Sequence, residues 1–491
     1  MRSIAPLSLA SLLAVLSLTV IAVPLDAAPA NQWGEPLTEE WIPRDRSHFV
    51  KRNGANITIF EHAATQSKLE YVSDSGICEM TKGVKSRSGY LTVGDNMNMW
   101  FWNFDARKDP ETAPLVAWFN GGPGCSSMIG LMQEHGPCAF NKGVEPENNT
   151  YSWNNYANMI YIDQPIGTGF SYGTNLANSS ATASPYVWKL LQNFYSAFPQ
   201  YKSREFGIYS ESYGGHYVPE FTSYILQQNK AIDEGKIKGE KIKIVAIGIN
   251  NGWTNPYDQY KAMIDFGANN TYKKLISAQQ YTTYTNTLNS RCKPQLEQCW
   301  KTDSNYDCQR AMLTCKAGIE SPMSRADFNV YDVRHPQKDP LPPETYLQYL
   351  ARADVMSAIG AKKKYEECPI GPNRKFAATG DDSRNFQPVL QDIVKAGVQV
   401  LIWAGDTDWI CNWMGNLATA NSVKYPGQTK FVAAPLQPYT VNGKKKGEFK
   451  QVDNLAFLKI FEAGHEAAYY QPEASLQAFV QTMQRTPLKS T

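Results

Sequence analysis

Short, almost wholly apolar runs recur along the chain after about residue 110. They cover residues 114–119, 159–162, 206–209, 244–249, 398–403 and 455–461. Continuous apolar runs of this length are typical of parallel strands that are covered on both faces. Helical patterns lie between several of these runs, so the order predicts an α/β fold: a doubly wound, mostly parallel central sheet with helices on both faces.

Polar positions set the limits of the other expected elements. Residues 88–93 and 97–104 alternate like an antiparallel pair, whereas residues 31–88 show little periodicity and are expected to wrap the surface. Ser184 and Pro185 predict an N-cap and first turn for a helix that runs to about Phe198. Helical patterns also cover 218–228 and 344–359.

The alternation of strands and helices breaks between residues 255 and 343. This region is polar, rich in Tyr and Asn, and expected to form helices near 278–288 and 306–315. We interpret it as a cap subdomain inserted into the sheet domain. The predicted organisation is a signal peptide (1–22), the first part of the core (23–254), the cap (255–343) and the second part of the core (344–491).

The N-terminus predicts export from the cell. A largely apolar run at 7–23 follows Arg2 and includes Val20-Ile21-Ala22, a small-residue cleavage pattern. A membrane anchor is the alternative, but the run is short for a bilayer span. Four glycosylation sequons support the secretory route, and we expect an extracellular protein more than a vacuolar or lysosomal one. They begin at Asn56, Asn148, Asn178 and Asn269.

Charge and cysteine content narrow the function classes. The 491 residues carry a formal net charge of +2, without a long basic run, so nucleic acid is not an expected partner; Lys444–Lys446 is expected to be a solvated turn. Nine cysteines in an exported protein imply disulfides and one remaining thiol. Four of the cysteines lie close together, at spacings of seven, nine and seven residues. These spacings are too wide for a typical zinc site, so we expect disulfides there. The four cysteines are Cys292, Cys299, Cys308 and Cys315.

The segment 209–217 carries the first candidate for chemistry. Ser212 lies between an apolar run and a helical pattern, among small residues, which is typical of the nucleophile elbow of α/β-hydrolases. Ser210 occupies the place of the usual first glycine. An ordinary strand-to-helix turn with a surface serine is the alternative.

A serine nucleophile needs a base and an orienting carboxylate. Among six histidines, His465 follows the last apolar run, whereas His216 lies on the helix after the elbow and is expected to be structural. The order nucleophile, acid, histidine places the acid after 398–403, where Asp406 or Asp408 could serve.

The glycine-rich segment 120–127 follows another apolar run. Its backbone N–H groups suit an oxyanion hole, and it is similar to the glycine loop of esterases. A phosphate cradle is the alternative, but no lysine follows the glycines.

Together these motifs resemble those of the serine carboxypeptidases, the family of carboxypeptidase Y. The resemblance is greatest to the secreted fungal-type members of that family. The resemblance runs from about residue 88 to 472, with the cap as its loosest part, and rests on several long motifs in the same order. They are 120–127, 163–172, 211–213, 408–413 and 464–465.

The resemblance implies a complete set of site residues. Ser212 would attack the last peptide bond, with His465 as base and Asp408, rather than Asp406, as orienting acid. The N–H groups of Gly122 and Tyr213 would form the oxyanion hole. The free carboxylate of the substrate would be held by Asn120, Gly121, Glu211 and Glu134, the two glutamates sharing a proton. By its residue type alone, Glu134 would be a carboxylate on a helix face.

The resemblance also implies a set of disulfide pairs. It further implies an enzyme that uses neither a metal nor a cofactor. The pairs would be Cys292–Cys315, Cys299–Cys308 and Cys125–Cys368, with Cys78–Cys138 remaining and Cys411 as the free thiol. Glu466 departs from the better-known relatives, which have Met after the histidine. It could favour a basic leaving residue, or it could face solvent without effect.

The expected activity is acid-favoured hydrolysis of the C-terminal peptide bond of peptides and proteins through an acyl-enzyme. An acyltransferase or esterase on the same scaffold is the alternative. A non-catalytic binding or chaperone-like protein is a third, which the intact Ser212, Asp408 and His465 disfavour.

Overall fold

The computed structural model describes residues 45–491, except 53, 63–66, 142, 326 and 339–341. The predicted signal peptide, 1–22, lies outside the described residues. None of the helices in the described range combines the length and apolar composition needed to cross a membrane.

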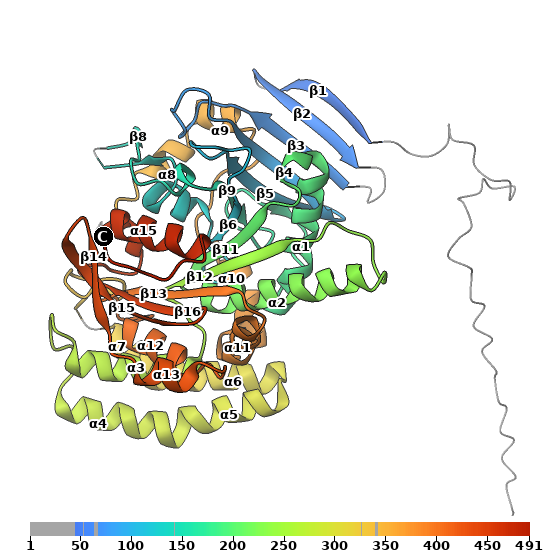
Figure 1. Cartoon of the computed structure of the whole chain (residues 1–491). Helices are drawn as coiled ribbons and strands as arrows, with labels where there is room; N and C mark the ends of the chain where they lie inside the picture. The colour runs from blue at the N-terminus through green and yellow to red at the C-terminus, as the bar shows by residue number, and fades with distance from the viewer. Residues whose placement is uncertain (1–44, 53, 63–66, 142, 326, 339–341) are drawn as a thin grey trace, which may run out of the picture. The chain divides into compact units, whose positions relative to one another are not determined.

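Six parallel strands form the centre of one large sheet (Figure 1). Their spatial order is β9, β6, β11, β12, β13, β16, and each lies on one of the predicted apolar runs. Their bounds are Asn158–Asp163, Leu115–Phe119, Glu205–Glu211, Lys243–Asn250, Gln399–Gly405 and Leu455–Ile460. All neighbours within this group pair in parallel, so their carboxyl ends meet at one edge.

Antiparallel strands extend the sheet on both sides, so the whole sheet is mixed. On one side lie β1 (Arg46–Arg52), β2 (Ala55–His62), β3 (Ser67–Ser73), β4 (Ser86–Gly94) and β5 (Met97–Phe104), and the other side ends in β15 (Lys444–Val452) and β14 (Gln437–Val441). The pairing of β4 with β5 confirms the predicted antiparallel pair. The expectation of surface wrapping for 31–88 is wrong for β1–β3, and Lys444–Lys446 begins a strand rather than forming a turn.

Two hydrophobic layers explain why these runs become strands. Alternate residues of β6 point to opposite faces: Leu115 and Phe119 join a core with α1 and α2, whereas Val116 and Trp118 join a core with α15. Helices α1 (Ser180–Ala197), α2 (Gly214–Asp233) and α11 (Gln387–Lys395) cover the first face, and α8 (Tyr346–Leu350), α9 (Ala353–Ile359) and α15 (Pro472–Met483) cover the second. Helices on both faces agree with the predicted fold class.

Two predicted helix limits need correction. Helix α1 begins one turn earlier than predicted, because Ser179 and Thr182 form a reciprocal capping box and Pro185 lies inside the helix. The pattern at 344–359 forms two helices, α8 and α9, rather than one.

Helices dominate residues 256–324 and have their own small core. This region holds α3 (Pro256–Asn269), α4 (Ala278–Thr287), α5 (Lys293–Thr302), α6 (Asn305–Cys315) and α7 (Ser321–Ser324). Helices α4 and α6 confirm the two helices predicted near 278–288 and 306–315. Five buried cysteines lie in this core, four of them from this region and the fifth Cys411. Figure 1 shows α3–α6 together beside α12 (Trp413–Ser422) and α13 (Gln428–Ala433).

Candidate active site

The carboxyl ends of the central strands bring most of the predicted site residues into the lining of one cleft of about 870 Å³. Asp408, Tyr213 and Glu134 are not part of that lining. Loops after β6, β11 and β16 supply Asn120, Ser212 and His465 to its lining. Open α/β sheets bind ligands at this edge because the loops that leave the strands converge there. The predicted nucleophile and base therefore face the same space.

Ser212 has the backbone strain of a nucleophile elbow. Its φ of +59° lies in the left-handed region, between the end of β11 and the start of α2. A Cβ atom on Gly215 would lie 2.5 Å from the backbone of Trp253, so that position requires glycine. These features favour the elbow over an ordinary turn.

The structure explains why Ser210 is accepted in place of glycine. Its buried hydroxyl donates a hydrogen bond to the carbonyl of Phe119 and so joins β11 to the end of β6. A Cβ atom on Gly214 would lie 2.1 Å from Ser210 Oγ, so the small residue on the helix side provides the space. The elbow geometry is retained.

His465 and Asp408 form a buried hydrogen-bonded pair. His465 Nδ1 lies 2.9 Å from Asp408 Oδ2, and backbone N–H groups of Ile410 and Cys411 also donate to this carboxylate. Burial by itself lowers the pKa of His465, but the charges of Asp408 and Glu211 outweigh burial and raise it above its ordinary value. No described hydrogen bond joins His465 to Ser212, and such bonds are often long in free enzymes.

The other candidates left open by the sequence have structural partners. Asp406 accepts hydrogen bonds from Tyr272 and the N–H of Glu462, so it ties the two loops that carry Asp408 and His465. His216 is buried, and its ring nitrogens face the carbonyls of Trp253 and Asp381. This placement favours Asp408 as the orienting acid and a structural role for His216.

The glycine loop lies directly against the elbow. A Cβ atom on Gly121 would lie 2.5 Å from the backbone N of Tyr213, which explains the glycine. Gly122 has a φ of +110°. Among the hydrogen bonds described here, none uses the N–H of Gly122 or of Tyr213, so both donors are available to an oxyanion at this place.

Two buried glutamates lie beside Asn120 at the cleft. Asn120 Nδ2 donates to Glu211 Oε1 at 2.6 Å, and Asn120 Oδ1 is fixed by Trp118 and by the N–H of Gly130. Burial, and then the charge of Glu211, hold the pKa of Glu134 well above its usual range. Two such carboxyl groups favour a shared proton at mildly acidic pH.

Glu466 is one of four glutamates in the lining of the cleft, together with Glu211, Glu344 and Glu367. Its pKa is raised well above the usual range by burial and then by the charges of Glu211, Glu367 and Glu344. Its Oε2 atom is buried without a hydrogen-bond partner in the described structure. Glu466 therefore lines the cleft rather than facing open solvent.

The cysteines are arranged as the resemblance implies. The structure contains the disulfides Cys78–Cys138, Cys125–Cys368, Cys292–Cys315 and Cys299–Cys308. Cys411 is free and buried, and burial raises the pKa of its thiol well above the ordinary value. The Cys125–Cys368 bond ties the glycine loop to the cleft wall.

Sequence reasoning missed three buried polar residues that hold the site. Asn250 and Asn251, at the end of β12, donate to the carbonyl of His465 and to the carboxylate of Asp408. Asp163, at the end of β9, accepts hydrogen bonds from Ser126 Oγ and Ser127 N in the glycine loop. Their position at the carboxyl ends of buried strands was a signal available in the sequence, and Asp163 also begins the motif 163–172.

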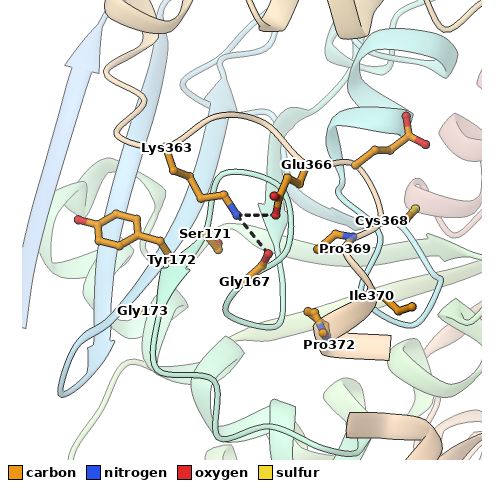
Figure 2. A pocket seen from close by; sticks show the side chains of 12 residues that line it. Gly167, Ser171, Tyr172, Gly173, Lys363, Glu366, Cys368, Pro369, Ile370 and Pro372 are labelled. Carbon is orange, nitrogen blue, oxygen red and sulfur yellow. Dashed lines mark hydrogen bonds and ion pairs between the residues drawn. The ribbon is translucent and has the colours of Figure 1, made fainter. Parts of the chain in front are cut away.

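A second hollow, of about 700 Å³, adjoins the cleft (Figure 2). It shares only Glu367, Cys368, Pro369 and Ile370 with the lining of the cleft. Lys363 points into this hollow and donates to the carbonyl of Gly167, with Glu366 3.5 Å away. None of Ser212, Asp408 and His465 lines it, so the candidate chemistry belongs to the first cleft.

Comparison with known proteins agrees with this geometry. Residues 78–485 match the family model "Serine carboxypeptidase" (Peptidase_S10). The chain is 56% identical over 423 residues to Carboxypeptidase S1 of Penicillium janthinellum, covering 86% of this chain and 100% of the relative. It is 33% identical over 468 residues to Carboxypeptidase Y homolog A of Talaromyces stipitatus, covering 92% and 82%.

A solved structure supports the fold independently. The crystal structure of Kex1(delta)p, a prohormone-processing carboxypeptidase from Saccharomyces cerevisiae, matches with a TM-score of 0.68 at 22% identity, covering 82% of this chain and 91% of that one. At that identity the likeness shows the α/β-hydrolase fold alone. The matched family model, the identity to curated relatives and the fold lead to one conclusion: this chain belongs to the serine carboxypeptidase family and is a serine carboxypeptidase.

Proposed function

We propose that this enzyme releases C-terminal residues from peptides and proteins through an acyl-enzyme on Ser212. Ser212 Oγ attacks the carbonyl carbon of the last peptide bond while His465 accepts its proton, and Asp408 orients and stabilises the imidazolium. The N–H groups of Gly122 and Tyr213 stabilise the oxyanion. The C–N bond then breaks, His465 protonates the leaving amine, and water releases the acyl group by the same steps.

The observation that carries the exopeptidase assignment is the buried carboxyl pair beside Asn120. Glu211 and Glu134, with a shared proton, can donate to the free carboxylate of a substrate that Asn120 and Gly121 also contact. Because the pKa of Glu134 is held high, this donor is present at acidic pH and is lost as the pH rises. This pair favours binding of the substrate carboxylate at acidic pH, whereas protonation of His465, whose pKa is raised, opposes catalysis as the pH falls.

We propose that residues 255–343 act as a cap that restricts the cleft to chain ends. Its support is the lining of the cleft, which includes Ser324, Asn329, Tyr331, Gln337 and Pro342 from this segment. The carbonyl of Tyr331 accepts a hydrogen bond from the N–H of His465, so the segment is fixed against the active centre. The remaining parts, 23–254 and 344–491, form the sheet domain in this proposal.

We propose secretion after removal of residues 1–22. The four sequons support this route: Asn56, Asn148 and Asn269 are exposed and Asn178 is half-buried, so glycans could be attached with little disturbance of the core. The partners in this proposal are peptide and protein C-termini, with neither nucleic acid nor membrane.

A blocked peptide assayed with and without an added alcohol tests the acyl-enzyme mechanism. We expect stoichiometric release of the C-terminal amino acid, partial diversion of the acyl group to the alcohol as an ester, and at least a 1000-fold loss of rate in Ser212→Ala. Mass spectrometry identifies both products.

The same assay distinguishes the alternatives. An enzyme that cleaves a simple ester but releases no amino acid from the peptide would support the acyltransferase or esterase reading. Full activity of Ser212→Ala would contradict the assigned nucleophile, and no activity on any substrate in the native protein would favour a binding protein.

A further inference from the structure

The end of strand β12 contacts all three residues of the proposed triad. The carbonyl of Asn250 accepts a hydrogen bond from Ser212 N at 3.0 Å, and Trp253 N donates to the carbonyl of Ser212. Asn250 Nδ2 donates to the carbonyl of His465 at 2.8 Å. These bonds come from one buried turn, so its conformation is coupled to the whole catalytic arrangement.

Asn251 makes the most direct of these contacts. Its Nδ2 lies 2.8 Å from Asp408 Oδ2, the same oxygen that receives the hydrogen bond from His465 Nδ1. Its Oδ1 accepts a hydrogen bond from the N–H of Gly405 at 2.9 Å, at the end of β13. Only a side chain with both a donor and an acceptor satisfies these two neighbours.

The backbone of Asn251 is held in an uncommon conformation. Its φ of +39° lies in the left-handed region, the residue is fully buried, and its N–H donates to the carbonyl of Trp403 at 2.8 Å. Asparagine tolerates this region better than most residues, but glycine would adopt it with less strain. The retention of a side chain here points to a role for the amide beyond the turn itself.

We infer that Asn251 is a positioning residue of the catalytic centre: its amide fixes and stabilises the ionised Asp408 carboxylate in the orientation that His465 requires. This inference rests on the proposed roles of Asp408 and His465. Loss of the amide would leave Asp408 held only by the N–H groups of Ile410 and Cys411 and by His465, so the carboxylate could shift. A small misplacement of a catalytic group can cost about 100-fold in rate.

Two substitutions test the role of the Asn251 amide separately from that of its backbone conformation. Asn251→Gly keeps the left-handed conformation and removes the amide. We expect a folded protein with a lower Tm, because the buried N–H of Gly405 loses its acceptor, an unchanged KM and a kcat that falls about 10- to 100-fold. Asn442→Gly is the matched control, because Asn442 also has a positive φ, of +49°, but lies in the exposed turn between β14 and β15. We expect it to leave kcat unchanged.

Asn251→Asp provides a pH-dependent rescue. At low pH the new carboxyl and Asp408 would share a proton, so the acid O–H could donate in place of the amide. As the pH rises this proton is lost and two like charges face each other. We therefore expect the ratio of kcat for Asn251→Asp to kcat for Asn251→Gly to be well above one at pH 4.5 and to fall steadily toward pH 7.

Two results would overturn the inference: a native kcat in Asn251→Gly, or equal rates of the Asp and Gly variants at every pH. Titration of the folded fraction by circular dichroism excludes misfolding as the cause of a low rate. The Ser212→Ala control keeps the tests separate, because its failure to abolish activity would contradict the proposed function, whereas these two results would contradict the role of Asn251 alone.

Discussion

At the residue scale, Glu466 is a carboxyl with a raised pKa in the lining of the cleft. It follows His465 directly, lines the same cleft and lies near Glu344 and Glu367, whose charges contribute to its raised pKa. A neutral Glu466 has little electrostatic preference between leaving residues. Once ionised, it would attract a leaving residue with a positive side chain. We propose that Glu466 contributes to selection of that residue.

The Glu466→Met variant tests this proposal with two peptides that differ only in a C-terminal Lys or Leu. We expect the Lys/Leu ratio of kcat/KM to increase with pH in the native enzyme and to be about tenfold lower in the variant once Glu466 is ionised, or ~1.4 kcal/mol. Glu111→Met, in the exposed loop before β6, is the control. Equal ratios in the native enzyme and Glu466→Met at every pH would leave Glu466 without a role in specificity.

Ser212 and Asn251 show what could be predicted for single residues. Ser212, Asp408 and His465 could be proposed because residue type, chain order and a position after a buried strand agreed. Asn251 was missed because an asparagine after a strand is also a common turn residue. Its proposed role depends on contacts at and after the end of β13, with Gly405 and Asp408, which are distant in the sequence. Asp406 could not be separated from Asp408 until the partner of each carboxylate was known.

At the element scale, the buried central strands were predictable and the exposed outer strands were not. The core strands read as continuous apolar runs because both of their faces are covered. Strand β1 is exposed along almost its whole length, so its sequence carries no apolar alternation, and its strand state comes from pairing with β2. Helix α1 was placed one turn late because Pro185 resembled a first-turn proline while the cap lies at Ser179.

Glu70 on β3 links an outer strand to the segment after α9. It forms ion pairs with Arg52, with Lys68 at 2.6 Å and with Lys362. Burial alone would raise the pKa of Glu70, but these cations outweigh it and lower the pKa to about 2. Because the folded pKa is below the unfolded value, the contribution to stability is present above pH 4.5 and is lost as the pH falls toward 2.

Glu70→Gln is therefore expected to lower the free energy of unfolding by about 1–2 kcal/mol at pH 7, allowing for screening by water. Urea unfolding at pH 7, 4.5 and 3 measures the difference, which we expect to shrink below pH 4.5. Glu61→Gln, at an exposed position of β2, is the matched control. A loss of stability that is the same at all three pH values would show that the hydrogen-bonding shape of Glu70, rather than its charge, is responsible.

At the scale of the whole molecule, the proposed catalytic residues and the proposed recognition of the substrate's C-terminus meet at one cleft. The sheet supplies the edge from which the proposed nucleophile, base and acid project, and the family assignment makes the chain a carboxypeptidase, which acts at a chain end. The buried carboxyl pair gives a physical reason for that end-specificity, since a protonated pair can bind a carboxylate that an ionised pair would repel. Recognition of the terminus and its dependence on pH thus have one origin in this account.

The most direct test compares one peptide as its free acid and as its C-terminal amide between pH 4 and 8, in the native enzyme and in Glu134→Gln. We predict that the acid/amide ratio of kcat/KM is high at pH 4.5 and falls as the pH rises in the native enzyme. In Glu134→Gln, which cannot share a proton with Glu211, the ratio should vary much less with pH. An acid/amide ratio that is independent of pH in the native enzyme, or that changes with pH identically in Glu134→Gln, would contradict the account.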